Sequence, residues 1–298
     1  MEVRNKICVV TGSEQGLGKA FAKILLDHGA KVCISDLKKD AAKLTLEEFQ
    51  NQFGRERVCF VSCDVTKKEE FISLFNETEK FFNVDCVDML VNNAGVNSNL
   101  GWKTCMDVNI MGLMTGSEIV MERMKNVSKK GFIINIASMA GVVTGTSEDQ
   151  IGYTASKHAV VALTRTLAVD FKVHGVSIKA LCPSFADTEL FSSAKQLSTN
   201  KDVVGRLVKR SGGLMSPDYV SQGFYKLVTE CDNGAVMWAV NGMPFGIIPD
   251  TGNLKVLIIG LMARIIGKVN GGDIVTVKQQ KLFIFFVFIL FLIACTLL

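Results

Sequence analysis

The sequence predicts an α/β protein with a doubly wound parallel sheet, and three observations support this prediction. Short apolar runs alternate with longer segments that have helical periodicity. The apolar runs are continuous, as in strands that are covered by helices on both faces. A glycine-rich turn lies between the first apolar run and the first helical segment, which is typical of a βα unit in such a sheet.

The expected strands are runs of aliphatic and β-branched residues, which favour a buried, extended conformation. They are at residues 7–10, 30–35, 58–62, 89–91, 132–136, 176–181 and 235–240. The intervening segments have apolar residues at helical spacing. They are at residues 19–28, 40–53, 67–82, 102–127 and 154–174. Because no linker or internal repeat interrupts this alternation, we expect a single domain over residues 1–250.

The composition is that of a globular protein. The chain has 298 residues, of which 48% are hydrophobic and 21% are charged, and this balance excludes a disordered chain. The net charge of +4 is spread along the chain, so nucleic acid is not an expected partner. The 9 cysteines show no Cys-x-x-Cys spacing, and we expect reduced thiols and no metal site. The N-terminus has no apolar stretch of a secretory signal, so we expect the folded domain in the cytoplasm.

The C-terminal segment 282–298 contains no charged residue. Its length is at the lower end of what crosses a bilayer, and Lys278 and Lys281 precede it as the positive-inside rule prefers. We expect a transmembrane tail anchor, with a buried core helix or a strand as the alternative. The preceding segment 251–281, apolar over 254–269, is expected to lie at the membrane interface or to pack on the domain.

The glycine-rich turn is a candidate cofactor site. Gly12 allows a tight turn, Gly16 allows backbone N–H groups to approach a pyrophosphate, and Gly18 allows close packing of helix and strand. Gln15 and Leu17 belong to the same turn. The turn leads into the N-terminus of a helix, where the helix dipole is positive and favours a bound phosphate. An ordinary strand-to-helix turn is the alternative.

Asp36 ends the second predicted strand, and Leu37 follows it. A carboxylate at this place accepts hydrogen bonds from both ribose hydroxyls and repels a 2′-phosphate, which favours NAD over NADP. Lys38 and Lys39 come next, and a nearby cation weakens that discrimination. No basic residue lies beside Glu14 in the turn, which removes one place to hold a phosphate. NAD is therefore the expected cofactor, and a carboxylate that caps the next helix is the alternative.

Further polar motifs follow along the chain. They are Asp64-Val65, Asn92-Asn93-Ala94-Gly95, Ser138 and Tyr153-Thr154-Ala155-Ser156-Lys157. Tyr153 and Lys157 lie one helical turn apart and therefore share a helix face. An adjacent ammonium and a positive nicotinamide ring favour the phenolate, which can take a proton from an alcohol. Ser138 follows an apolar run, at the strand end where doubly wound sheets bind ligands.

In this order, the motifs resemble those of the short-chain dehydrogenase/reductase family, over about residues 4–250. The resemblance implies a Rossmann-type fold and NAD-dependent alcohol oxidation. It implies that Ser138, Tyr153, Lys157 and Asn109 are catalytic, with Asn109 holding a water of the proton relay. A buried asparagine that bonds to the backbone is the alternative for Asn109.

The resemblance also implies the binding residues. Contacts to the cofactor are expected from Asp64, Val65, Asn93, Tyr153, Lys157, Ala186 and Thr188. The substrate would meet Ser138, Tyr153 and Gln150, although a solvent-facing loop position is the alternative for Gln150. The family further implies a homodimer through the segments 102–127 and 154–174.

Within the family, several shorter segments are most similar to members that act on a hydroxylated lipid. They are Asn97, Trp102, Gln150 and the segments 180–185 and 232–237. The apolar side chains of Phe185, Leu190 and Phe191 suit a lipid, although they could also belong to the core. We expect oxidation of a secondary hydroxyl on an apolar, eicosanoid-like alcohol by a membrane-anchored enzyme. A sterol or retinol dehydrogenase, and a non-catalytic membrane-bound NAD-binding scaffold, are the alternatives.

Overall fold

The computed structural model describes residues 2–143, 150–197 and 201–250. Met1–Ile248 form one compact unit. The predicted juxtamembrane segment 251–281 and tail anchor 282–298 lie outside the described residues, so both stay predictions. Within the described ranges we find no helix with the length and hydropathy of a membrane span.

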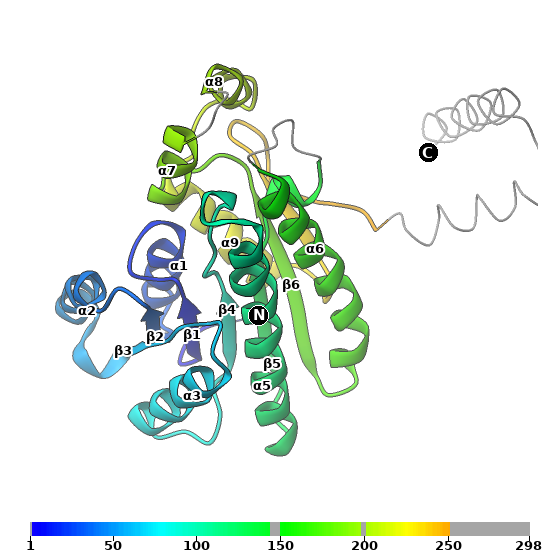
Figure 1. The fold of residues 1–298 in the computed structure, drawn as a ribbon. Helices are drawn as coiled ribbons and strands as arrows, with labels where there is room; N and C mark the ends of the chain where they lie inside the picture. The colour runs from blue at the N-terminus through cyan, green and yellow to red at the C-terminus, as the bar shows by residue number, and fades with distance from the viewer. Residues whose placement is uncertain (1, 144–149, 198–200, 251–298) are drawn as a thin grey trace, which may run out of the picture. The chain divides into compact units, whose positions relative to one another are not determined.

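One 8-stranded sheet forms the centre of the domain, in the order β3-β2-β1-β4-β5-β6-β7-β8 (Figure 1). The strands are β1 (Ile7–Thr11), β2 (Lys31–Asp36), β3 (Val58–Ser62), β4 (Met89–Asn92), β5 (Gly131–Ile136), β6 (Val176–Pro183), β7 (Val236–Ala239) and β8 (Gly246–Ile247). Pairing from β3 through β7 is parallel. The strand order reverses between β1 and β4, and ligands of doubly wound sheets bind at such a switch point. The predicted doubly wound sheet is therefore confirmed.

Strand β8 is not among the strands predicted from the sequence. This strand pairs antiparallel with β7, with Met237 opposite Ile247 and Trp238 opposite Gly246. Gly246 has no side chain, and this lets its backbone approach the Trp238 ring, whose Nε1 donates to the carbonyl of Pro244 at 3.0 Å. Two residues are too short a run to show strand periodicity in a sequence.

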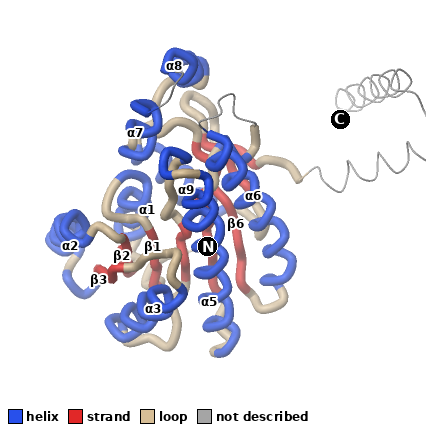
Figure 2. Tube along the Cα trace, viewed as in Figure 1, coloured by secondary structure: helices blue, strands red, loops and turns tan. Residues whose placement is uncertain are grey.

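Helices cover both faces of the sheet (Figure 2). They are α1 (Gly16–Asp27), α2 (Lys39–Phe53), α3 (Lys68–Phe82), α4 (Trp102–Met106), α5 (Leu113–Asn126), α6 (Ile151–Lys172), α7 (Glu189–Leu197), α8 (Lys201–Arg210) and α9 (Pro217–Glu230). Helices α1, α2 and α9 pack on one face, where the rings of Phe21 and Phe224 stack with centroids 4.5 Å apart. Helices α3, α5 and α6 pack on the other face, around Phe71, Phe75 and Met124.

The predicted helical segment 102–127 is helical in the structure, but its middle is not α-helical. A π-helical segment, Asp107–Gly112, separates α4 from α5. At Gly112 a Cβ atom would lie 2.8 Å from the carbonyl oxygen of Val65, so the helix approaches the loop after β3 closely there. Asn109 lies in this segment, and π-helical turns inside α-helices are frequent at functional sites.

Helices α7, α8 and α9 are not predicted by the analysis of the sequence. Helix α9 begins with Ser216 as N-cap, whose Oγ accepts from the amide of Tyr219 at 3.1 Å. The Ser-Pro pair at its start is a known helix-start pattern that could have identified it. At its other end the buried ammonium of Lys179 donates to the carbonyls of Leu227 and Val228, at 3.2 and 3.1 Å. Burial lowers the pKa of Lys179.

A chain of buried polar side chains crosses the sheet and joins its helices. Asn92 Nδ2 on β4 donates to Ser117 Oγ on α5 and to Asn135 Oδ1 on β5, both at 3.0 Å. Asn135 Nδ2 donates to Thr164 Oγ1 on α6 at 2.9 Å. Buried polar groups need such partners, so these contacts fix α5 and α6 against the sheet.

Candidate active site

Ser138 and Tyr153 meet at the carboxyl edge of the sheet. Ser138 follows β5, and its Oγ accepts from the amide of Ala140 at 3.1 Å. Tyr153 lies in the first turns of α6, with its hydroxyl near enough to that of Ser138 for Ser138 to act on its pKa. The two hydroxyls are therefore close enough to hold a single substrate oxygen between them.

Burial raises the pKa of Tyr153, and the nearby side chain of Ser138 opposes this rise. The ammonium of Lys157 lies 5.6 Å from the centroid of the phenol ring. In the protein by itself the pKa of Tyr153 stays above its ordinary value. The expected phenolate depends on a positive nicotinamide ring as well as on the ammonium, so it stays a prediction.

Lys157 is a buried ammonium, with 5% of its surface exposed. Its Nζ donates to the carbonyl of Ile136 at the end of β5, at 2.8 Å. Burial lowers the pKa of Lys157 to about 8, against opposing effects of Cys182 and Cys105. The amine is thus protonated at neutral pH and titrates just above it, which places the group in the range useful for proton transfer.

Asn109 binds the neighbouring loop and helix through its side chain. Its Oδ1 accepts from the amide of Val96 at 2.8 Å, and its Nδ2 donates to the carbonyl of Val96 at 3.0 Å. The same Nδ2 donates to Ser156 Oγ at 2.9 Å, and Ser156 Oγ donates to the carbonyl of Tyr153 at 2.8 Å. These contacts match the alternative of a buried asparagine that bonds to the backbone. Its role in a proton relay stays a prediction.

The glycine turn approaches the loop after β4 so closely that side chains would not fit. Gly12 has a φ of +63°, and a Cβ on it would lie 2.8 Å from the Cα of Ala94. A Cβ on Gly18 would collide with the carbonyl oxygen of Gly12 and with the side chain of Asn93. Asn93 Nδ2 donates to the carbonyls of Thr11 and Gly12, both at 2.8 Å. Bare backbone at the start of α1 is the surface that a pyrophosphate needs.

Asp36 ends β2 beside this turn. Its Oδ1 accepts from the amides of Leu37 and Lys38, at 2.7 and 3.3 Å, and its Oδ2 accepts from the amide of Glu14 at 3.3 Å. Leu37 is 60% exposed. A fixed carboxylate at the end of β2, next to a glycine cradle, fits the adenosine half of a dinucleotide.

Asp64 and Val65 lie after β3. The Asp64 carboxylate accepts from the amide and hydroxyl of Thr66, at 3.0 and 2.7 Å, and lies 3.5 Å from Lys67 Nζ. Burial acts to raise its pKa, but the hydrogen bonds from Thr66 and the charge of Lys67 outweigh burial and lower the pKa of Asp64. Val65 is buried. The side chain of Asp64 therefore has local partners, and contact of either residue with adenine stays a prediction.

The segment after β6 lies against the glycine turn. Ala186 forms a β-bridge with Met215. Thr188 Oγ1 accepts from the amide of Phe191 at 3.3 Å at the start of α7. A Cβ placed on Gly16 would lie 3.3 Å from Thr188 Cγ2. The structure therefore brings Thr188 to the expected cofactor turn.

The predicted substrate residues lie around the same edge. Gln150 is half-buried and directly precedes α6, next to the undescribed residues 144–149. Asn97 Nδ2 donates to the carbonyl of Leu190. The rings of Phe185 and Phe191 lie 5.5 Å apart. The substrate contact of Gln150 stays a prediction.

Ser98 is a positioning residue that is not among the residues predicted from the sequence. Its Oγ accepts from the amide of Tyr153 at 2.8 Å, which ties the start of α6 to the loop after β4. No local pattern could have indicated this contact, because the two residues are separated by 55 positions along the chain.

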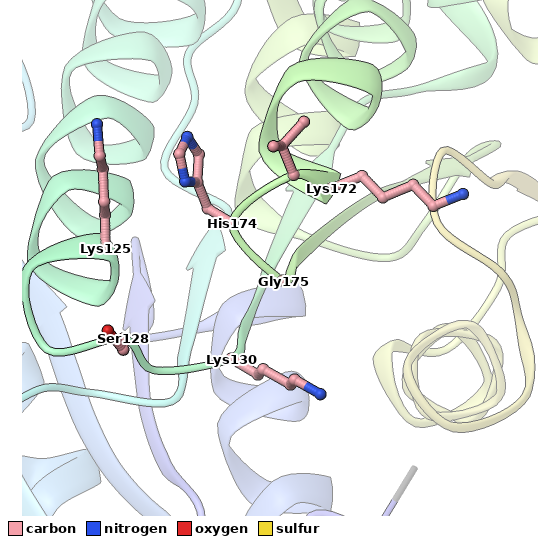
Figure 3. Close-up of a pocket in the computed structure, with 7 residues that line it drawn as sticks. Lys125, Ser128, Lys130, Lys172, His174 and Gly175 are labelled. Atoms are coloured by element: carbon pink, nitrogen blue, oxygen red, sulfur yellow. The ribbon is translucent and has the colours of Figure 1, made fainter.

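A surface hollow of about 490 Å³ lies at the opposite edge of the sheet (Figure 3). It is lined by Lys125, Ser128, Lys130, Lys172, Val173, His174 and Gly175. These residues directly precede β5 and β6 or end α5 and α6, so the hollow lies away from Ser138 and Tyr153. Figure 3 shows Lys125 and Lys130 pointing away from each other, so the side chains do not converge on one ligand.

Comparison with known proteins agrees with this geometry. The family model described as short chain dehydrogenase matches residues 6–198. The 15-hydroxyprostaglandin dehydrogenase (NAD(+)) of Mus musculus is 33% identical over 248 residues, which cover 80% of this chain and 90% of that protein. The enzyme of the same name from Homo sapiens is 32% identical and covers 80% of this chain and 91% of its own length. The crystal structure of levodione reductase has a TM-score of 0.72 at 23% identity, covering 80% of this chain and 97% of its own, and shows the fold alone.

Proposed function

Because the chain belongs to the short-chain dehydrogenase family, we propose that it oxidises a secondary hydroxyl of an apolar lipid to the ketone, with NAD as the cofactor. The substrate class is that of a 15-hydroxyeicosanoid. The observation that carries the proposal is the position of the Ser138 and Tyr153 hydroxyls at the carboxyl edge of the sheet, next to the buried ammonium of Lys157. The names of the relatives at 33% and 32% identity support both the cofactor and the substrate class.

Ser138 and Tyr153 perform the proton chemistry in this proposal. Both hydroxyls bind the substrate oxygen, and Tyr153 takes the proton of the alcohol as general base. NAD, when bound, supplies the hydride acceptor and a positive ring. Because burial raises the pKa of Tyr153, the phenol needs nearby positive charge before it can act as a base at neutral pH.

Lys157 supplies part of that charge. An ammonium has three donors, and one of them is used by the carbonyl of Ile136. The others are assigned to the nicotinamide ribose. Asn109, through Ser156, and Ser98 hold the first turns of α6 in place, so that Tyr153 and Lys157 keep their positions.

The cofactor is assigned to the crevice between the glycine turn and the segment after β6. The residues assigned to it are Gly12, Gln15, Gly16, Leu17, Gly18, Asp36, Leu37, Asp64, Val65, Asn93, Ala186 and Thr188. The close approach at Gly12 and Gly18 and the position of Asp36 are the observations that fit a dinucleotide.

The substrate is assigned to the apolar side chains near α7, Phe185, Leu190 and Phe191, with Gln150 orienting its polar part. Leu190 is 38% exposed and therefore accessible to a ligand.

The homodimer and the membrane tail belong to the same proposal. Val169 and Val173 on α6 and at its end are 71% and 82% exposed, as an apolar dimer face would be in a single chain.

The test is an assay of the full chain in detergent with NAD and three lipid alcohols: a 15-hydroxyeicosanoid, a sterol and a retinol. NADH formation is followed by absorbance. We expect turnover with the eicosanoid. Turnover with the sterol or the retinol alone would replace the substrate class, and NADH binding without any turnover would favour the scaffold alternative.

A further inference from the structure

The ammonium of Lys38 is held between two carboxylates. Its Nζ lies 3.1 Å from Glu14 Oε1 and 3.2 Å from Glu189 Oε2. Glu189 also accepts a hydrogen bond from the side chain of Gln15. The hydrogen bond with Glu14, followed by that with Glu189, raises the pKa of Lys38 despite partial burial, and Gln15 and Lys38 lower the pKa of Glu189. The positive charge of Lys38, which could otherwise bind a phosphate, is thus already paired with carboxylates.

These groups form one cluster with Asp36 at the end of β2, which we call the Lys38 cluster (Glu14, Asp36, Lys38 and Glu189). The amides of Glu14 and Lys38 both donate to the Asp36 carboxylate, at 3.3 Å each. The Glu14 side chain is 7% exposed. Two carboxylates therefore hold the Lys38 ammonium beside the expected adenosine ribose, and the third, Asp36, binds the backbone amide of the same residue. The cluster has a formal excess of negative charge.

Glu189 reaches this cluster from a distant part of the chain. It lies 151 positions beyond Lys38 and is the first residue of α7. Thr188, directly before it, lies over Gly16. The segment after β6 therefore adds a negative charge to the adenosine end of the crevice.

We propose that Glu14 and Glu189 are specificity-determining residues that reject NADP by holding Lys38 and by adding negative charge beside Asp36. This inference rests on the proposed function, since it concerns the same dinucleotide. A 2′-phosphate carries negative charge and would need a free cation at the ribose. Here it meets an ammonium that is already paired and carboxylates that repel it.

The test measures the dissociation constants of NADH and NADPH by calorimetry, with the full chain in detergent. Glu189 is 61% exposed in its side chain, so Glu189→Gln should fold normally. We expect the affinity for NADPH to rise about tenfold, about 1.4 kcal/mol, while the affinity for NADH stays within about twofold. Adding Lys38→Gln to this variant should remove most of the gain, because the released cation is then absent and only the loss of the Glu189 charge remains.

Asp40→Asn is the matched control. It removes the same charge close to Lys38, from a fully exposed side chain whose carboxylate lies 3.4 Å from Lys43 Nζ, and should leave both dissociation constants unchanged. Glu14→Gln is a second variant of the cluster, with the same expected direction as Glu189→Gln.

The outcomes separate this inference from the proposed function. NADH binding with an unchanged ratio of the two affinities in both Glu→Gln variants would overturn the inference and leave the proposed function standing. A gain in NADPH affinity that persists in full without Lys38 would overturn the role of the held ammonium. A wild-type protein that binds neither dinucleotide would overturn the proposed function itself.

Discussion

The proposed cofactor side, at the glycine turn, and the proposed substrate side, at α7 and the following α8, are built differently. On the cofactor side, Gly12 and Gly18 touch backbone so closely that no side chain fits, and Asn93 braces the turn. On the substrate side, Val204 is the only buried residue among the described side chains of α7 and α8. Substitutions on the cofactor side should therefore destabilise the fold strongly, and substitutions on the substrate side should destabilise it little. This explains why cofactor chemistry can be inferred from the fold, whereas the substrate has to be proposed.

The largest expected effect concerns Tyr153, which lies between the two sides. Tyr153→Phe keeps the ring but removes the hydroxyl, so turnover should fall by about 10²- to 10⁴-fold. Cofactor affinity should fall far less than turnover, because Tyr153 is one of many expected cofactor contacts and the glycine turn is untouched. Tyr225→Phe is the control, since the Tyr225 ring stacks on His28 with centroids 3.8 Å apart and far from Ser138 in the fold. A Tyr153→Phe variant with wild-type turnover would show that the assigned base is wrong.

The next effect is a pH dependence of stability. The pKa of Lys157 is lowered from 10.5 to about 8 in the folded protein. Between these values the unfolded chain binds the proton and the folded chain does not, so the free energy of unfolding should rise with pH. Relative to Lys157→Met, the wild type should gain about 3 kcal/mol from pH 8 to 10.5, which is the full shift converted to free energy. Parallel stability curves for the two proteins, measured by urea unfolding, would refute a buried ammonium.

A pair of glycine substitutions compares the two sides directly. Gly12→Ala places a Cβ at a φ of +63° and 2.8 Å from Ala94 Cα, and should destabilise the fold by about 1–3 kcal/mol. Gly205→Ala in α8 meets no atom within 4 Å and should leave stability unchanged or raise it by about 0.5–1 kcal/mol. Chemical denaturation measures both, and equal losses at the two positions would remove the distinction between the sides.

The smallest effect is expected on the substrate side. Phe191→Ala removes a half-buried ring that packs against Phe185 with centroids 5.5 Å apart. KM for a lipid alcohol should rise about 3- to 10-fold, as for about 1 kcal/mol of apolar contact. The dissociation constant of NADH should not change. A variant that loses NADH binding instead would place Phe191 in the cofactor site.

Local patterns predicted the strands and the glycine turn, because continuous apolar runs and glycine spacing are properties of neighbouring residues. They failed where a distant contact decides the local structure. The π-helical segment at Asn109 ends at Gly112, which approaches Val65 from a distant part of the chain. The pairing of Lys38 with Glu189 joins residues 151 positions apart. Helix α8 does carry apolar residues at helical spacing, Val203, Val204, Leu207 and Val208, so its pattern was present in the sequence and could have been recognised.

The central claim is that Tyr153 and Ser138 support hydride loss from a lipid alcohol to NAD. The most direct test uses a 15-hydroxyeicosanoid deuterated at the carbon that bears the hydroxyl, with mass spectrometry of the cofactor after the reaction. The proposed function predicts deuterium in the NADH from the wild type and no labelled NADH above background from Tyr153→Phe. Formation of the ketone without label in the NADH, or no reaction by a wild-type protein that binds NADH, would contradict it.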